Sequence, residues 1–473
     1  VRGQGQISSG KDGVCMVKKA FKYTHVGRLP EDWDCLQAIE VIDEISMGPF
    51  GSDITVSNFV SSGVPVLNGY NVSQIMLIDK FQNFVTPKKA KELKKAVAHR
   101  GDIIVTHRGT IGQVSYIPDS SSYSEYVISQ SQFRVHFNDK RVNSRFLVSY
   151  LLSPIGQKYL LETKGHTGVP ALAQPTTNFR RLWIPLPEIA EQVSIAEALS
   201  DIDSLISSLQ KLIEKKKAIK QGTMQELLTG KKRLPGFDEE WRTYKLGELG
   251  SFDKGCGVSR AESNTGNFPA VRYGELYTKH TDYVKQYYSC ISGDVAQTAK
   301  RVTFGDILFA ASGETKEEIG VCAAIVDRRD IFAGGDIVVF TPTTEINPIF
   351  FGTLLNMPFV QKQKSERGQG DAVVHIHADS LSEIIISMPE KNEQEAIATV
   401  IKDFNDEIEQ LERKLAKYQQ IKQGMMQELL TGRIRLVDAD DKEQPKTQIF
   451  QEKQSQPAHN QHFDDAVMIA GIV

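Results

Sequence analysis

One short stretch, Asn347-Pro348-Ile349-Phe350, has residue types suited to methyl-transfer chemistry. It lacks the second proline of the adenine-methyltransferase motif, and no glycine-rich cofactor loop precedes it. A second stretch, Asn143-Ser144-Arg145-Phe146, repeats the asparagine without the proline. Asparagine is a favoured N-cap and proline is tolerated at the first helical position. We therefore interpret Asn347 as the N-cap of a helix that begins at Pro348.

Other catalytic patterns are missing from the sequence. It contains no GxxxxGK[ST] phosphate loop, no HExxH zinc motif and no GxSxG nucleophile elbow. The ten histidines form no evident ligand cluster, and the five cysteines lack the spacing of a zinc knuckle. We expect a non-catalytic chain without a metal or cofactor of its own.

The chain repeats itself. Residues 187–234 recur as residues 389–436, and both copies contain the runs IKQG and MQELLTG. Upstream the repeat is weaker: Gly101-Asp102-Ile103 matches Gly305-Asp306-Ile307. Such long self-similarity fixes the architecture before any single motif does. It predicts the order domain, helix, domain, helix.

The repeated segments predict two long helices. Apolar residues spaced alternately by four and three form a coiled-coil seam, whose members are Ile195, Leu199, Ile202, Ile206, Leu209 and Ile213 in the first copy, and Ile397, Ile401, Phe404, Ile408, Leu411, Leu415 and Tyr418 in the second. Each stripe is narrow, so we expect the two helices to pair as an intramolecular antiparallel coiled coil.

Prolines and glycines set the expected limits of these helices. Pro187 and Pro389 are predicted in the first turns. Gly222 and Gly424 are expected to break or bend the helices, and Gly230 and Gly432 to stop them.

The domains between the helices have a mixed α/β (α+β) pattern. Runs rich in β-forming residues at 102–107, 114–117, 306–310 and 336–341 are broken by turn residues. The predicted layout is an N-terminal segment (1–30), a first domain (31–186), a first helical spacer (187–234), a second domain (235–388), a second helical spacer (389–436) and a polar, disordered tail (437–473).

Composition narrows the class of protein. Apolar residues make up 40% and charged residues 24% of the chain, and the net charge is −3. A negative balance argues against a nonspecific coat for nucleic acid, but it does not exclude a specific reader. No apolar run is long enough to span a membrane and no signal peptide is evident, so we expect a cytoplasmic protein.

The duplicated order of motifs resembles the specificity subunit of type I restriction-modification enzymes. The matching stretches are GPFGSDI (48–54), GVPVLNGYNV (63–72), GDIIVTHRGTIG (101–112) and IPLPEIAEQ (184–192), with weaker equivalents in GDILFAASG (305–313) and MPEKNEQ (388–394). The resemblance covers about residues 29–436 and implies two target-recognition domains joined by the helices in a pseudo-twofold repeat.

The resemblance also implies partners. Each target-recognition domain would bind one half of a bipartite, asymmetric DNA target, and the helices would dock two adenine methyltransferase subunits. Restriction subunits would join them to complete an ATP-dependent endonuclease. S-adenosylmethionine, ATP and Mg would be bound by those partner subunits, not by this chain.

We predict the contacts from polar and glycine residues that interrupt apolar patterns, because side chains on loops can read base edges in the major groove. Residues 51–53 are a further candidate turn. The DNA-binding candidates are Thr106, His107, Arg108, Gly109, Thr110, Lys164, Gly165, His166 and Thr167 in the first domain, and Ser312, Gly313, Thr315, Lys316, Arg367 and Gln369 in the second. The partner-docking candidates, taken from the near-identical helix ends, are Gln221, Gln225, Glu226, Gln423, Gln427 and Glu428.

Two alternatives remain open at the level of sequence. A methyltransferase or nuclease would bind S-adenosylmethionine or modify DNA by itself, and the missing motifs argue against it. A coiled-coil scaffold without sequence-specific DNA binding would not need two large, diverged domains. The target sequence, its spacer length and the base-contacting residues cannot be read from the sequence.

Overall fold

The computed structural model describes residues 20–162, 169–370 and 373–436. The chain divides into two compact units. Among the described residues, the first unit comprises residues 20–208 and 415–436, and the second comprises residues 209–414. The two long helices, α5 (Ile189–Leu227) and α12 (Lys391–Leu429), therefore each contribute one part to each unit.

The first unit is a mixed α/β structure built on a four-stranded antiparallel sheet in the order β10-β9-β12-β4. Its elements before α5 are β1 (Phe21–Thr24), β2 (Gly27–Pro30), β3 (Asp34–Gln37), β4 (Ile42–Met47), β5 (Phe59–Val60), β6 (Val64–Pro65), β7 (Phe84–Val85), α1 (Pro87–Glu92), β8 (Val97–His99), β9 (Ile103–Thr106), β10 (Val114–Tyr116), β11 (Glu125–Val127), β12 (Gln132–Phe137), α2 (Ser144–Leu152), α3 (Pro154–Leu160), α4 (Pro175–Arg180) and β13 (Trp183–Leu186). Helix α2 packs on β10, and β13 pairs with β3.

The second unit repeats this plan around a sheet in the order β15-β24-β20-β22-β17. Its elements are β14 (Arg242–Lys245), α6 (Leu246–Leu249), β15 (Gly250–Lys254), β16 (Phe268–Val271), α7 (Tyr273–Thr278), β17 (Asp282–Val284), β18 (Ser289–Ile291), α8 (Gly293–Thr298), β19 (Lys300–Val302), β20 (Ile307–Ala310), β21 (Ser312–Gly313), β22 (Cys322–Ile325), β23 (Ile331–Ala333), β24 (Ile337–Pro342), α9 (Pro348–Leu355), α10 (Pro358–Arg367), β25 (Val374–His375), α11 (Ala378–Ser382) and β26 (Ile385–Met388). Helix α9 packs on β22 and β17, and β14 pairs with β26.

Local sequence signals predicted these elements well. Asn347 caps α9 by accepting hydrogen bonds from the N–H groups of Ile349 (3.0 Å) and Phe350 (3.2 Å), with Pro348 at the first helical position. Asn143 caps α2 in the same way. The four predicted β-rich runs correspond to β9, β10, β20 and β24. The reading of the Asn347 stretch as a helix start is therefore confirmed.

The long helices differ from the prediction at two pairs of residues. Pro187 and Pro389 precede the first helical residues by two positions and do not lie within the first turns. Gly222 and Gly424 neither break nor end the helices, because both helices continue past them. Apolar residues that follow each glycine in sequence are buried, and this burial outweighs the cost of about 1 kcal/mol for glycine in a helix.

The predicted helix stops are confirmed. Gly230 and Gly432 follow the last helical residues at φ +67° and +66°, which is a left-handed conformation that glycine adopts without strain.

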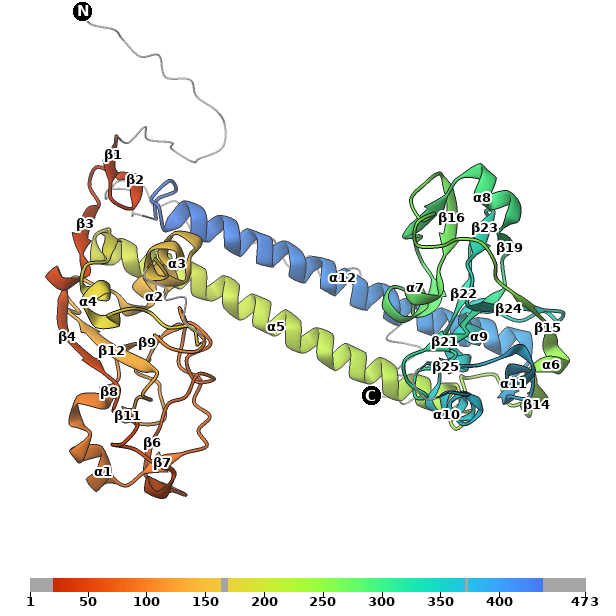
Figure 1. The fold of residues 1–473 in the computed structure, drawn as a ribbon, viewed down its shortest axis with the longest axis horizontal. Coiled ribbons are helices and arrows are strands. Elements are labelled where there is room, and N and C mark those ends of the chain that lie inside the picture. The colour runs from red at the N-terminus through yellow and green to blue at the C-terminus, as the bar shows by residue number, and fades with distance from the viewer. Residues whose placement is uncertain (1–19, 163–168, 371–372, 437–473) are drawn as a thin grey trace, which may run out of the picture. The chain divides into compact units, whose positions relative to one another are not determined.

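The two helices pair antiparallel within each unit, as the repeat predicts (Figure 1). In the first unit Lys422 contacts Asp203 at 2.6 Å. In the second, Lys216 lies 2.8 Å from Glu407 and Lys217 lies 2.7 Å from Glu412. These contacts flank the apolar stripe, most of which is buried.

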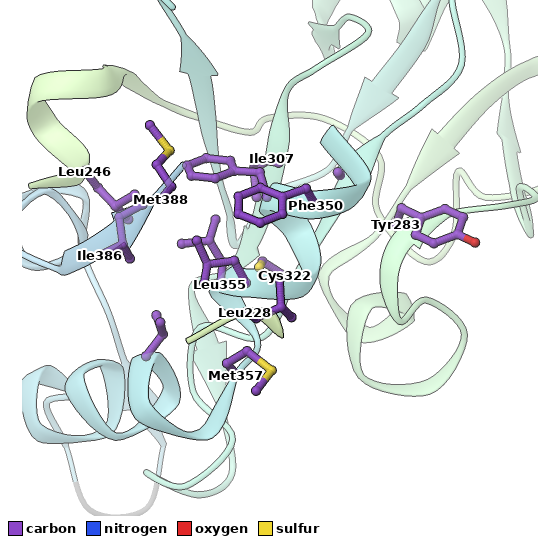
Figure 2. Close-up of a cluster of buried hydrophobic side chains, with 14 of the residues drawn as sticks. Leu228, Leu246, Tyr283, Ile307, Cys322, Phe350, Leu355, Met357, Ile386 and Met388 are labelled. Carbon is purple, nitrogen blue, oxygen red and sulfur yellow. The ribbon is translucent and has the colours of Figure 1, made fainter. Parts of the chain in front are cut away.

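The helices also complete the cores of the domains, which the narrow apolar stripes did not predict. Ile195 and Leu199 of α5, with Leu429 and Leu430 at the end of α12, belong to the core of the first unit. In the second unit the corresponding roles fall to α12 residues such as Ile397 and to the end of α5. Figure 2 shows Leu228, just after α5, among core residues of the second unit that include Cys322, Phe350 and Leu355.

A polar contact in the first unit explains part of the repeated sequence. Arg435 donates from Nε and Nη2 to the two carboxylate oxygens of Glu191, at 2.6 and 2.7 Å. Trp33 donates from Nε1 to Glu191 Oε2 at 3.1 Å. Arg435 also donates two hydrogen bonds of 2.8 Å to Asp32. We call the set of Arg435, Glu191 and Trp33 the first Arg-Glu-Trp contact.

The second unit contains the equivalent contact. Arg233 donates to both oxygens of Glu393 at 2.6 Å, and Trp241 Nε1 donates to Glu393 Oε2 at 3.2 Å. This set is the second Arg-Glu-Trp contact. Each contact ties the end of one long helix segment to the start of the other, so the repeated Glu and Arg have an intramolecular packing role.

Across the described ranges, no helix combines the length and apolar character that a membrane span requires.

Candidate nucleic-acid interface

Four loops of the first unit meet where strands β4 and β9 end and β12 begins. The N–H of Gly48 donates to the carbonyl of Gln132 at 2.9 Å, and the N–H of His107 donates to the carbonyl of Ser131 at 2.9 Å. The side chain of Gln132 donates to the carbonyl of Asn68 at 3.2 Å. We call residues 48–53, 68–72, 107–113 and 129–131 the first loop cluster.

The second unit repeats these backbone hydrogen bonds between loops, which we call the loop frame. The N–H of Gly255 donates to the carbonyl of Ile337, and the N–H of Ala311 to that of Asp336, both at 2.9 Å. Residues 255–260, 272–276, 311–316 and 334–336 form the second loop cluster. Because the hydrogen bonds that the two units share join backbone groups, the side chains on these loops can differ without changing them.

One position of the frame shows this difference clearly. Pro65 and Pro269 are equivalent, 204 positions apart, so Asn68 corresponds to Arg272 and Asn71 to Glu275. In the first unit the buried Asn71 accepts a hydrogen bond from the N–H of Asn68 at 3.0 Å. In the second, Glu275 accepts one from the N–H of Arg272 at 3.3 Å.

Glu275 is an ionised carboxylate in a mostly buried position. Burial opposes its ionisation, but the nearby His280 side chain, whose Nε2 lies 3.9 Å away, together with hydrogen bonds from Ser289 and the backbone N–H of Arg272, outweighs burial and lowers the pKa of Glu275. The carboxylate therefore stays negative at neutral pH and fixes the cation beside it.

Three segments of the second loop cluster, residues 257–260, 272–275 and 335–336, line a cleft of about 800 Å³. Three cationic side chains, Arg260, Arg272 and Lys279, line it together with Tyr273 and Tyr288. Cations and aromatic rings are the groups that contact phosphates and bases. Chemically, the cleft is suited to a polyanion with planar groups.

The loop at the edge of this cleft is held in a strained conformation. Val258 has φ +53°, which is unfavourable for a β-branched residue, and its side chain is 4% exposed. It packs in an apolar cluster with Ala270, Ile291 and Phe332. Burial of Val258 thus anchors residues 255–260 beside the cleft.

Among the predicted residues of the first domain, residues 107–110 fall in the first loop cluster, and Thr106 directly precedes it. Thr106 is buried in β9, whereas Arg108, Gly109 and Thr110 are exposed. His107 is half-buried; burial lowers its pKa, and the nearby Arg108 lowers it further against the opposing hydrogen bond with Gln130. The predictions for Lys164, Gly165, His166 and Thr167 lie outside the described residues.

The predicted residues of the second domain are also divided. Thr315 and Lys316 are exposed. Ser312 is buried and shares a 2.9 Å hydrogen bond with Nδ1 of His375. Gly313 pairs with Val374 in the two-stranded sheet of β21 and β25.

Two further predicted residues lie at and just after the end of α10: Arg367 is its last residue, and Gln369 follows it. Gln369 exchanges backbone hydrogen bonds with His375, which brings the exposed Gln369 near the second loop cluster. The guanidinium of Arg367 donates to the carbonyls of Gln363 (2.9 Å) and Glu383 (3.4 Å), so it caps backbone groups.

Sequence reasoning missed Asn68, Arg260, Arg272 and Lys279. Nothing marks them in isolation, since a single arginine or asparagine between apolar residues is common on any surface. The available signal was the offset of 204, which extends the repeat upstream through Pro65 and Pro269. It would have identified Asn68 and Arg272 as diverged residues at one conserved backbone position.

The docking candidates lie on the outer faces of the helix ends. Gln221, Gln225, Glu226, Gln423 and Gln427 are exposed, and Glu428 is half-buried. Gln221 and Gln225 also line a cavity of about 650 Å³ in the second unit. The Arg-Glu-Trp contacts do not involve these residues, although Glu428 pairs with Arg433 at 3.4 Å.

Comparison with known proteins agrees with this architecture. The family model of the type I restriction modification DNA specificity domain matches residues 60–221 and 238–423. The type I restriction enzyme MjaVIII specificity subunit of Methanocaldococcus jannaschii is 24% identical over 438 residues, which cover 88% of this chain and 96% of the relative.

Two solved structures share the fold. The S subunit of a type I restriction-modification system from M. genitalium has a TM-score of 0.53 at 15% identity, covering 84% of this chain and 96% of that one. A chain from a study of complex assembly and conformational transition in the type I R-M system has a TM-score of 0.51 at 15% identity, covering 86% and 99%. With two matched stretches that together span more than half of its length, this chain belongs to the family of type I restriction-modification specificity subunits and carries two copies of the DNA specificity domain.

Proposed function

We propose that this specificity subunit binds a bipartite, asymmetric DNA target, with one half-site read by each loop cluster. The observation that carries the proposal is the pair of loop clusters: one backbone frame, built twice, with different side chains. A frame of this kind suits two readers of different sequences, because base edges in the major groove are distinguished by side-chain donors and acceptors. A scaffold would gain nothing from this divergence.

We further propose that the chain is non-catalytic and works only with partners. Two adenine methyltransferase subunits would dock on the helix ends around Gln221 and Gln423, and restriction subunits would complete the assembly. S-adenosylmethionine, ATP and Mg would be held by those partners. This arrangement is supported by the structural similarity to a chain from a study of complex assembly in the type I R-M system.

The decisive experiment exchanges one domain. The full chain is expressed with its methyltransferase subunits, and methylated adenines are mapped across the host genome. Replacing residues 30–185 with the corresponding domain of a relative should change one half of the methylated target and leave the other half intact. A hybrid that alters both halves, or a parent complex without a bipartite target, would refute two independent readers.

Docking is tested on the exposed helix ends. Gln225→Trp and Gln427→Trp should each weaken co-purification of a methyltransferase subunit, because a bulky apolar ring disrupts a polar contact surface. Gln210→Trp, at an exposed position nearer the middle of α5, is the matched control. Unchanged assembly in both end variants would exclude these residues from the docking surface.

A further inference from the structure

The guanidinium of Arg272 is fixed on one side only. Its Nε donates to Oε1 of Glu275 at 3.2 Å and to Oγ of Ser289 at 3.0 Å. Glu275 is 4% and Ser289 1% exposed, and Ser289 also donates to Glu275. Within the described ranges, neither terminal amino group of Arg272 has a hydrogen-bond or ion-pair partner. The side chain lines the cleft of the second loop cluster.

This geometry is suited to a particular base. A guanidinium whose Nε is occupied still presents two parallel N–H donors, and guanine offers O6 and N7 as two adjacent acceptors in the major groove. A positioned side chain loses less entropy on binding than a free one. On the basis of the function proposed above, we propose that Arg272 reads a guanine in the half-site bound by the second unit, with Glu275 as its positioning residue.

The equivalent residue of the first unit makes the proposal asymmetric. Asn68 Oδ1 accepts a 2.9 Å hydrogen bond from the N–H of Tyr70. Its amide has one NH2 group, whereas a guanidinium has two terminal amino groups that can donate side by side. The same backbone position therefore reads guanine in the second unit and does not do so in the first. Substitution of Asn68 should leave the guanine in the second half-site untouched.

Two neighbouring cations could contact DNA in a different way. Arg260 and Lys279 line the same cleft, and in the part of the chain that the structure describes no buried carboxylate pairs with either side chain. Contacts to phosphate give affinity without sequence information, and their loss reduces the dependence of binding on salt. The experiment must therefore separate a base contact from a phosphate contact at Arg272.

The test uses the full chain with its methyltransferase subunits and DNA duplexes that contain the mapped target. Each guanine of the second half-site is replaced in turn by 7-deazaguanine, which lacks the N7 acceptor. The parent complex should lose roughly 5- to 150-fold in affinity at one guanine. The Arg272→Lys complex should bind the normal duplex more weakly by a similar factor and should show little further loss at that guanine.

Arg272→Lys keeps the charge, so the slope of affinity against salt should not change. Arg242→Lys is the matched control, since Arg242 is an exposed arginine of the same unit that pairs with Glu390 and does not line the cleft. Glu275→Gln should weaken discrimination at the same guanine while it leaves the other positions unchanged.

Several results would overturn the proposal. If no guanine of the second half-site is sensitive to 7-deazaguanine in the parent complex, Arg272 does not read N7, whatever the variants do. Uniform weakening over all sequences by Arg272→Lys would identify a phosphate contact or a structural role instead. A parent complex that shows no sequence preference would instead refute the proposed function itself.

Discussion

The two target-recognition domains share the pairing of their central strands but bury different side chains at equivalent positions of these sheets. The residue that pairs with Ile104 in the first unit is Arg134, and the residue that pairs with the equivalent Leu308 in the second unit is Val339. Arg134 is 3% exposed and Val339 is fully buried. The same strand position can therefore bury either a cationic or an aliphatic side chain.

The reason lies in the partners of the cation. Arg134 Nη1 lies 3.3 Å from Oδ2 of Asp102, whose Oδ1 lies 2.8 Å from Nδ1 of His136. Arg134 also pairs with Glu44. Asp102 and its equivalent Asp306 both accept a backbone hydrogen bond from the preceding turn, at His99 and Thr303, but among the described residues only Asp102 has an arginine opposite it, because Val339 takes the place of Arg134. A buried charge is tolerated only where its domain supplies a complete set of partners.

The largest effect on stability is expected from a substitution that breaks this buried ion cluster. Arg134→Met should lower the free energy of unfolding of the first unit by about 3–5 kcal/mol, because it leaves Asp102 buried without its main counter-charge. Denaturant unfolding followed by tryptophan fluorescence measures the loss. The control is Arg141→Met, whose exposed pair with Asp34 spans 4.0 Å and should contribute less than about 1 kcal/mol. Equal effects of both substitutions would contradict the role of burial.

The next prediction compares the contributions of the two Arg-Glu-Trp contacts to stability. Arg435→Ala and Arg233→Ala should each destabilise their own unit by about 2–3 kcal/mol, since each leaves a buried glutamate without its bidentate partner. Arg435→Ala should cost more, because Arg435 also binds Asp32.

Unfolding of the two variants, read by hydrogen exchange in each unit separately, checks this order. Lys391→Ala, which removes an exposed pair with Glu345, is the control and should change little. Destabilisation confined to the wrong unit would show that the contacts are not local.

A smaller effect on stability is expected from a substitution that makes the two domains more alike. Lys364 is fully buried and donates to the carbonyl of Gly320 at 2.7 Å, whereas its equivalent in the first unit is the buried Leu160. Burial lowers the pKa of Lys364 to about 8, against a smaller opposing effect of Cys322 and Asp282. Lys364→Leu should therefore stabilise the second unit by about 1–2 kcal/mol at pH 7, after the lost hydrogen bond is counted.

The pH dependence gives an independent check. In the parent, the unfolded chain binds the Lys364 proton more tightly than the folded chain between about pH 8 and 10.5. The penalty is fully present below pH 8 and disappears as the pH rises through this window, so stability rises there. The Lys364→Leu variant should lack this rise, and a parent whose stability falls across the window would contradict the assignment.

The smallest effect concerns the glycines within the long helices. Gly222 and Gly424 have nothing within 4 Å of an added Cβ and do not adopt positive φ. Gly222→Ala and Gly424→Ala should each raise thermal stability by about 0.5–1 kcal/mol. Gly230→Ala should do the opposite, because Gly230 lies at φ +67°. Destabilisation by Gly222→Ala would indicate that a bend is needed at this position.

The sequence by itself determined the repeat, the helix seams, the asparagine N-caps and the glycine stops. Each of these follows from local rules: periodicity places apolar residues on one helix face, and Asn143 or Gly230 satisfies the backbone within a few residues of itself. The same rules failed at Gly222 and Gly424, where burial of neighbouring side chains overrode the low helix propensity of glycine.

Only the tertiary structure decided which residues meet. Arg435 and Glu191 are joined although 244 positions separate them, and loops 255–260 and 334–336 enclose one cleft with Arg272. Periodicity carries no information about such contacts, because they depend on how strands pair and which helix end closes which core. Arg272 differs from any other surface arginine through Glu275 and Ser289, and burial of those two groups arises only when β16, α7 and β18 are packed together.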